Sequence, residues 1–359
     1  MRASSTMPLL VVWMAVAASV GPVAAVEPPY EIERVGEGIY WVVRELGGAN
    51  AMVIVNDRDC VVVDSHVSPA VARGTIAAIR SLTDRPVRYV VNTHWHTDHV
   101  VGNAAYLEAF PTSVEFIAHR TVREDIQNLA AAQLPAAIRY LREDLVTGDR
   151  MLAAGVDQDQ RTLSDVQTER LRRFLDDQGR TIEELDASSF VLPDLAIDRE
   201  LVLHRGERQI RILHLGRGHT RGDLVVYLPR ERIVATGDLL THPTLYVSRA
   251  SRPVEWLESL RALAELDFAV AIPGHGTEAL DRDYLELIIA VLGEVVSEVR
   301  RGVGEGRGFA EIEPRVSLAA VETDWVADDP GRREVFRAAT EFVSDAVAVA
   351  YLEATGRLD

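Results

Sequence analysis

The chain has 359 residues, 47% of them apolar, which is enough for one large domain or two small ones with a full hydrophobic core. Its 55 acidic residues outnumber its 38 basic residues, all of them arginine, so the formal net charge is -17. Such an acidic chain is poorly suited to nucleic acids or anionic membranes, and the lack of lysine excludes Schiff-base catalysis.

Residues 1–25 have the pattern of a secretory signal peptide. Arg2 supplies a short positive region, Met7–Val20 is uncharged and apolar or small, and Val23-Ala24-Ala25 offers the small residues of a cleavage site. The apolar run is shorter than the ~20 residues that a membrane span needs. We therefore expect a secreted or periplasmic protein that keeps no membrane anchor after cleavage.

Short apolar runs rich in valine and isoleucine predict strands in the first half of the remaining chain. These runs lie at residues 39–43, 51–55, 60–63, 87–92 and 114–118. Residues 69–82 have the apolar spacing of a helix, with Ser68 as its N-cap and Pro69 in its first position. A second helix is expected at about residues 102–109.

The character of the sequence changes from about residue 120 to 190, where it is charged, helical in period and poor in strand signals. This stretch predicts a helical insertion. Strands then resume at residues 200–203, 209–213, 224–228, 232–235 and 268–272, with an amphipathic helix at 253–266. Residues 281–359 are mostly helical. We expect an α/β domain at residues 26–280, with two sheets packed face to face and helices outside, followed by a C-terminal helical extension.

The most informative motif, His94-Trp95-His96-Thr97-Asp98-His99, follows the predicted strand at residues 87–92. In an extended stretch His94 and His96 point to the same side, where two imidazoles can hold one zinc ion. Asp98 and His99 cannot easily reach that same ion and are better placed to hold a second one. The motif therefore predicts a metal site on a loop at the C-terminal end of a strand.

Three later motifs can complete the coordination of two ions. They are Gly218-His219-Thr220, Thr236-Gly237-Asp238 and Pro273-Gly274-His275-Gly276. Each ends a strand-like run and contains glycine, as a close approach of the backbone to a metal requires.

With these four motifs in this order, residues 39–277 resemble the metallo-β-lactamase superfamily. The resemblance implies a four-layer αββα sandwich with two Zn²⁺ ions at one edge. It assigns His94, His96 and His219 to the first zinc, Asp98, His99 and His275 to the second, and Asp238 to a bridging position. A hydroxide shared by the metals would attack the substrate's carbonyl group, and Asp98 would orient the hydroxide and relay its proton.

Other polar residues at strand ends are candidates for supporting roles. Asp64 ends a predicted strand and either holds the metal loop or a ligand histidine, or caps the strand. His66 and His242 follow strand ends near the expected site and are candidate pocket residues. His119 is expected on the surface, and His214 in the core or bonded to a neighbouring backbone group.

The fold alone does not select a substrate. Asp238 stands where the β-lactamases of the family have cysteine or serine, and Thr241 where a lysine grips the β-lactam carboxylate. Both differences, together with the expected export, favour a general zinc hydrolase of a small ester, lactone, thioester or amide, with weak β-lactamase activity at most. Three alternatives remain open: an iron-dependent oxidoreductase such as a persulfide dioxygenase, a dedicated β-lactamase, and a non-catalytic binding module. The sequence predicts a small-molecule partner and does not fix the oligomeric state.

Overall fold

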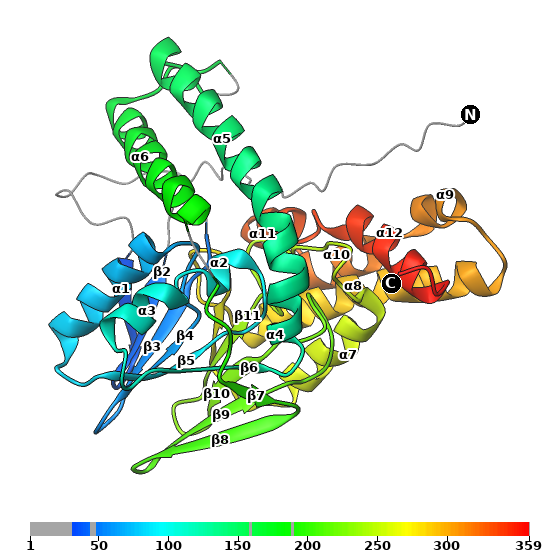
Figure 1. The fold of residues 1–359 in the computed structure, drawn as a ribbon. Helices are drawn as coiled ribbons and strands as arrows, with labels where there is room; N and C mark the ends of the chain where they lie inside the picture. Colours follow the sequence, from blue (N-terminus) through cyan, green and yellow to red (C-terminus); the bar gives the residue numbers. More distant parts are fainter. Residues whose placement is uncertain (1–30, 44–47, 158–159, 188–189, 359) are drawn as a thin grey trace.

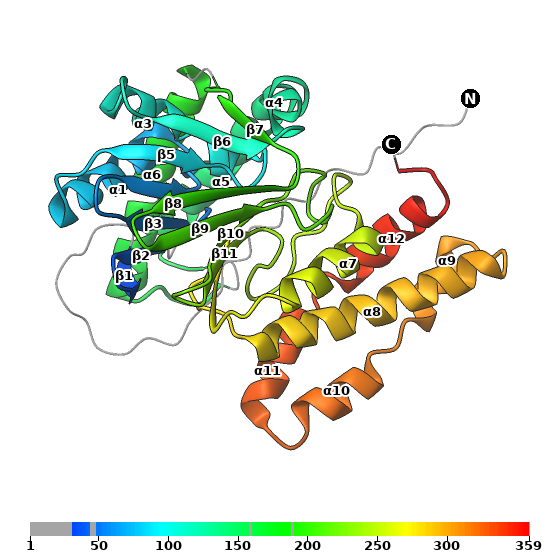
Figure 2. The same cartoon turned by 90° about the horizontal axis from the view of Figure 1, so that it is seen from below.

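The computed structural model describes residues 31–43, 48–157, 160–187 and 190–358. Within them, two mixed β-sheets lie face to face, with helices on their outer faces (Figure 1, Figure 2). This confirms the predicted α/β sandwich. The predicted signal peptide, residues 1–25, lies outside the described residues. In the described part of the chain, no helix is both long enough and apolar enough to cross a membrane.

The first sheet has seven strands in chain order. They are β1 (Glu31–Gly36), β2 (Ile39–Val43), β3 (Ala51–Val55), β4 (Cys60–Val63), β5 (Val87–Val91), β6 (Glu115–His119) and β7 (Leu195–Ile197). Neighbours from β1 to β4 pair antiparallel, and neighbours from β4 to β7 pair parallel. The sequence predicted β2 to β6 but missed β1 and β7. These two are the edge strands, which are largely exposed and lack the continuous apolar run of a central strand.

The second sheet has five strands in the order β12-β11-β10-β9-β8, and the sequence predicted all five. They are β8 (Glu200–Arg205), β9 (Arg208–Leu213), β10 (Val225–Leu228), β11 (Ile233–Gly237) and β12 (Val270–Pro273). Only β11 and β12 pair parallel.

Three apolar clusters show the four layers of the sandwich. The helices α1 (Pro69–Leu82) and α3 (Asn103–Ala109) pack on the first sheet through a cluster that includes Ile76 and Phe116. A second cluster, with Ile54 and Ile212, fills the space between the sheets. The third joins the second sheet to α7 (Pro253–Ala264) and α8 (Arg282–Gly304). As predicted, α1 begins with the Ser68 side chain accepting a hydrogen bond from the Val71 N–H.

The predicted helical insertion is confirmed. Its elements are α4 (Val122–Asp125), the π-helix η1 (Ile126–Ala130), α5 (Ala131–Ala154) and α6 (Asp165–Ala187). Helices α5 and α6 form a pair that projects from the sandwich (Figure 1). The base of the pair contacts the sandwich through an apolar cluster of Val101, Ile138, Ile182 and Leu185. Because Val101 follows the metal-like motif, the insertion adjoins the candidate site.

The predicted C-terminal helices complete the outer layer on the second sheet. After α8 come α9 (Phe309–Ile312), the 3₁₀ helix η2 (Glu313–Arg315), α10 (Ala319–Val326), α11 (Pro330–Ala339) and α12 (Val343–Ala354). The buried faces of α8 and α12 belong to the same apolar cluster as α7 (Figure 2). These helices therefore extend the core of the sandwich.

Two pairs of parallel strands bring the predicted motifs to one edge of the sandwich. Strands β4 and β5 align Val63 with Val91, so the chain leaves both strands at the same end of the first sheet. Strands β11 and β12 align Gly237 with Pro273 in the second sheet. Parallel neighbours end together, and polar side chains that follow them can therefore converge.

Candidate metal centre

The motif after β5 begins as extended backbone and ends as a helical turn. His96 is extended, and the short helix α2 (Thr97–Val100) starts directly after it. The sequence predicted a loop throughout, so its second half is a correction. Successive residues of a helix point about 100° apart. The turn therefore lets Asp98 and His99 face a different place from His94 and His96.

Seven side chains from four segments of the chain converge in two groups. The first group is His94, His96, His219 and Asp238, and the second group is Asp98, His99 and His275. Within each group, one potential ligand atom per residue lies within 4.8 Å of all the others. Asp238 also faces the second group: its Oδ2 lies 3.3 Å from His275 Nε2 and its Oδ1 3.3 Å from His99 Nε2. Asp238 thus stands between the two groups.

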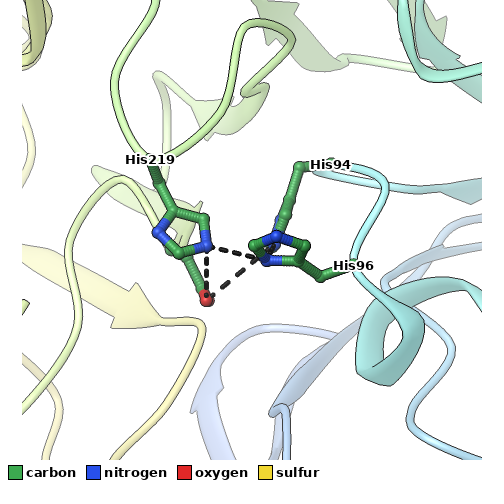
Figure 3. Close-up of side chains that lie close together, drawn as sticks. His94, His96 and His219 are labelled. Atoms are coloured by element: carbon green, nitrogen blue, oxygen red, sulfur yellow. Dashed lines mark hydrogen bonds and ion pairs between the residues drawn. The ribbon is translucent and has the colours of Figure 1, made fainter. Parts of the chain in front are cut away.

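The three imidazoles of the first group turn their ring nitrogens toward one another (Figure 3). His96 Nδ1 lies 3.0 Å from His94 Nε2 and 2.8 Å from His219 Nε2. Asp238 Oδ2 lies 3.4 Å from His219 Nε2. Ligands of one tetrahedral zinc are separated by roughly 3.3 Å when each zinc–nitrogen bond is ~2.05 Å. The observed distances lie on both sides of that value, since His94 Nε2 is 3.9 Å from Asp238 Oδ2.

In His94 and His219, Nδ1 points away from the first group and Nε2 points into it. The hydrogen bond made by Nδ1 determines whether Nε2 carries a lone pair. His219 Nδ1–H donates to the Tyr246 carbonyl at 2.7 Å, because a carbonyl can only accept. The Thr93 hydroxyl donates to Asp64, so it accepts from His94 Nδ1–H at 3.1 Å. In the neutral rings, the Nε2 lone pairs of His94 and His219 therefore point at the centre of the first group. Such an outer hydrogen bond is usual for histidines that bind metals.

Asp64 fixes the conformation of the His94–His99 motif through hydrogen bonds. Its Oδ1 accepts the Thr93 backbone N–H at 2.7 Å, and its Oδ2 accepts the Thr93 hydroxyl and His99 Nδ1–H, each at 2.8 Å. The Asp64 backbone lies in the left-handed region, at φ 60°, which few residues other than glycine adopt. One carboxylate therefore orients His99 directly and His94 through Thr93.

The second group contains two histidines that face carboxylates. Asp98 Oδ2 lies 3.2 Å from His275 Nε2 and 3.7 Å from His99 Nε2. Burial would lower the pKa of His99, but the charges of Asp64, Asp238 and Asp98 raise it well above its usual value. Burial would also lower the pKa of His275, and Asp238 and Asp98 again raise it. The carboxylates of this group therefore favour a positive charge.

The first group behaves differently, since its histidines are held neutral. Burial, followed by the charge of His219, lowers the pKa of His96 to about 3. Burial also lowers the pKa of His94 and of His219. Neutral imidazoles are the form that binds metal, so these rings need not lose a proton at neutral pH to become ligands.

Two buried atoms at the centre have no hydrogen-bond partner within the described chain, His99 Nε2 and Asp238 Oδ1. These two atoms face each other at 3.3 Å, and a buried imidazole nitrogen and carboxylate oxygen without hydrogen bonds are costly unless a cation, either a proton on the ring or a metal ion, lies between them. These atoms, the converging lone pairs and the mixture of imidazole and carboxylate donors all fit a pair of metal ions.

Several residues that shape the site were not found from the sequence. The Asn50 side chain donates to the Pro273 and Gly276 carbonyls, at 3.1 and 2.8 Å, and so ties the first sheet to the loop of His275. The Asn92 side chain donates to the His99 carbonyl at 3.0 Å. Asn92 does follow an apolar strand directly. The hydrogen bond from His219 reaches only the Tyr246 backbone and so leaves no signal in side-chain identity, whereas the Tyr246 ring packs edge-on against His275, with 5.1 Å between the ring centroids.

The other predicted histidines lie in different surroundings. His66 is fully buried, with ring nitrogens 2.9 Å from the Ala49 carbonyl and from the Thr75 hydroxyl, so it supports the frame and lines no open pocket. His242 is mostly buried, and its backbone N–H donates to the His275 carbonyl. The expectation that His119 lies on the surface is wrong. It is 4% exposed, because its ring stacks on His214.

Comparison with known families matches the sequence to the Metallo-beta-lactamase superfamily over residues 44–124 and 139–275. Among curated proteins, the chain is 23% identical over 271 residues to the linear primary-alkylsulfatase of Pseudomonas sp. (strain ATCC 19151). That match covers 72% of this chain and 48% of the relative. The chain is also 24% identical over 301 residues to the 2,4-dinitroanisole O-demethylase subunit alpha of Nocardioides sp. (strain JS1661). This match covers 82% of this chain and 73% of the relative.

Among solved structures, the fold is similar to that of the inverting sec-alkylsulfatase Pisa1 from Pseudomonas sp., with a TM-score of 0.63 and 18% identity. The match covers 90% of this chain and 50% of that one. The chain therefore spans about half the length of each of these two alkylsulfatases.

Proposed function

The chain belongs to the metallo-beta-lactamase superfamily and is a metal-dependent hydrolase, and we propose that it hydrolyses the sulfate ester of a small organic molecule. The observation that carries the hydrolytic part is the pair of His/Asp groups that share Asp238. The sulfate ester is proposed because alkylsulfatases are similar to this chain both in sequence and in fold.

Two residues support a substrate other than a β-lactam. Asp238 contacts histidines of both groups, a position where dedicated β-lactamases of the family have cysteine or serine. Thr241 is fully buried, and its hydroxyl donates to the Thr244 carbonyl at 2.6 Å. It therefore offers nothing to grip a substrate carboxylate.

We propose Zn²⁺ as the ion in both groups, held by His94, His96 and His219 on one side and by Asp98, His99 and His275 on the other, with Asp238 shared. Imidazole and carboxylate donors without thiolates suit zinc and also suit iron. When bound, such ions supply Lewis acidity that polarises an ester and lowers the pKa of water. Metal analysis of the purified protein tests this assignment, and iron at one ion per chain would contradict it.

Asp98 is the residue that we propose as proton relay. Its side chain is 19% exposed, whereas that of Asp238 is 3% exposed, so Asp98 is the carboxylate of the two that a substrate and solvent can reach. The charges of His99 and His275 outweigh burial and hold the pKa of Asp98 well below its usual value. A carboxylate is ionised at neutral pH without any such help, and at this partly exposed position it can accept a proton from water during attack.

Carbonyl esters, lactones and thioesters remain the second class of substrate, since a polarising metal site can act on them equally well. The deciding experiment is a panel of substrates with metal-loaded protein: alkyl and aryl sulfates beside a carboxylic ester, a lactone, a thioester and a β-lactam. We expect the highest kcat/KM with a sulfate ester and a large loss in Asp98→Ala. Turnover of the carbonyl substrates alone would replace the sulfatase proposal, and activity that survives Asp98→Ala would contradict the site.

We also propose that the protein is exported, on the basis of the signal-like pattern of residues 1–25. N-terminal sequencing of protein from cell fractions tests this. A mature chain that begins near Val26 outside the cytoplasm is expected, and an uncleaved cytoplasmic chain would contradict export.

A further inference from the structure

A cavity of about 410 Å³ lies apart from the two groups that could bind metal, and none of the seven residues of those groups lines it. Four segments form its walls: the end of β6, the turn between β7 and β8, the end of β9 and the loop that carries His219. Four arginines and two histidines line it, together with Thr121 and Asp198. The lining thus holds four cationic side chains and one carboxylate, although the chain as a whole has a net charge of -17.

One part of the cavity wall is a stacked pair of imidazoles, of which His119 is buried and His214 half-buried. The rings of His119 and His214 lie 4.1 Å apart and 26° from parallel. His119 Nδ1 lies 3.0 Å from the Thr121 hydroxyl, and His214 Nδ1–H donates to the Asp223 carbonyl at 2.9 Å. Both rings are therefore fixed in orientation.

Charged groups act on this pair from both sides. Burial lowers the pKa of His119 to about 4, the charges of His214 and Arg120 add to that effect, and the charge of Asp198 opposes it. A neighbouring anion would act in the same direction as Asp198.

The guanidinium groups around the cavity keep donors to spare. Arg120 uses Nε to bond Asp198, the only carboxylate of the lining, and Arg217 uses Nε to bond Glu255 at 2.8 Å. The terminal nitrogens of both have no hydrogen bond within the described chain. The Arg199 side chain is exposed, and no ion pair or hydrogen bond to another described residue engages it.

The fourth arginine is held rigidly in place. Arg221 bonds both carboxylate oxygens of the buried Asp125 through Nε, at 2.9 and 3.1 Å, and also reaches Glu124. A guanidinium fixed in this way loses little side-chain entropy when a ligand binds.

We propose that this cavity binds a small molecule through a tetrahedral oxyanion, a phosphate or a sulfate group. Guanidinium forks match such oxyanions in geometry and charge. The volume falls within the range of small-ligand sites, about 300–1,000 Å³, and leaves room for an organic part beside the anion. Because Arg217 and Arg221 flank His219 in sequence, a bound anion also contacts the loop that carries a metal-group residue.

The test is isothermal titration calorimetry of the metal-loaded protein at low ionic strength, with inorganic phosphate and inorganic sulfate as separate probes. We expect saturable binding of one of them, weakened about tenfold in Arg199→Ala and in Arg217→Ala, as the loss of a charged hydrogen bond implies. The probe that binds more tightly identifies the anion. Arg199→Lys should retain part of the affinity, because it keeps the charge but not the fork.

Arg315→Ala is the matched control, since this exposed arginine on η2 lies in the C-terminal helices. Its affinity for the probe should equal that of the unaltered protein. The proposal is overturned if no saturable binding occurs, if Arg199→Ala and Arg217→Ala bind as tightly as the unaltered protein, or if Arg315→Ala loses as much. The second outcome would place the anion elsewhere, including at the metals. Both altered cavity residues are exposed, so we expect these variants to fold, and their circular dichroism spectra check this.

Discussion

The metal edge and the helical lobe differ in how firmly neighbouring residues hold their side chains in place. The metal edge consists of the loops after β4, β5, β9, β11 and β12, and the helical lobe consists of α5 and α6. At the edge, His99 is 0% and Asp238 4% exposed, and several side-chain hydrogen bonds fix the loops from both sheets. In the lobe, most residues along both helices are exposed or half-buried. The edge therefore holds one arrangement of the candidate ligands, whereas the lobe can change its surface without moving them.

Asp238→Asn should cause the largest loss of function at the metal edge. The carboxylate oxygens of Asp238 lie within 3.4 Å of histidines of both groups, so the substitution removes a negative charge that both ions would share. We expect hydrolysis to fall by about 1,000-fold, the upper end of the range for the loss of one electrostatic group in an active site. Steady-state kinetics measures this. Asp84→Asn, at an exposed position, is the control, and equal activities of the two variants would show that Asp238 is not part of the centre.

Gly102→Ala should destabilise the edge. A Cβ at this position would lie 1.7 Å from the Ser65 carbonyl oxygen and 2.9 Å from the Ala72 side chain. Since the nearest atom belongs to the backbone, the loop of Asp64 or α3 must shift. We expect the free energy of unfolding to fall by about 3 kcal/mol, as in overpacked cores. Urea denaturation checks the value, and a change below about 1 kcal/mol would mean that the edge is less rigid than its contacts imply.

Asp64→Asn should weaken the edge more mildly, because asparagine also tolerates the left-handed backbone of this residue. The amide can still accept the Thr93 N–H, but its NH₂ group meets His99 Nδ1–H as a second donor. His99 must then rotate or change tautomer. We expect metal affinity to drop about 10- to 100-fold, as for other outer hydrogen-bond partners of metal histidines. Competition with a chelating dye measures this, and an unchanged affinity would contradict the orienting role of Asp64.

Gly179→Ala should have the smallest effect and the opposite sign. Gly179 lies within α6, and a Cβ there would have no neighbouring atom within 4 Å. Alanine is the better helix former by about 1 kcal/mol. We expect the melting temperature to rise slightly and hydrolysis to stay unchanged. A loss of stability would show that the lobe packs against something at this face, and a loss of activity would couple the lobe to the metals.

The same contrast explains what could be predicted from the sequence. The edge motifs were recognisable because His94, His219 and His275 each follow a strand and combine with glycines and aspartates in a fixed order. For the lobe, the sequence predicted helices but not where they lie on the sandwich, because exposed charged residues do not determine what a helix packs against.

The failures of the prediction have equally physical causes. The edge strands β1 and β7 lack buried runs, and the helical turn in the metal motif follows from the tertiary frame. His119 looked like a surface residue because its neighbour His214, which directly follows β9 of the other sheet, lies 95 residues further along the chain.

The central claim is that the edge holds two metal ions that share Asp238. The most direct test is the number of zinc ions bound per chain, measured by elemental analysis after loading and dialysis of the unaltered protein, His219→Ala and Asp98→Ala. We predict two ions for the unaltered protein and one for each variant, since each variant loses a ligand of only one group. A single ion in the unaltered protein under saturating zinc would contradict the account.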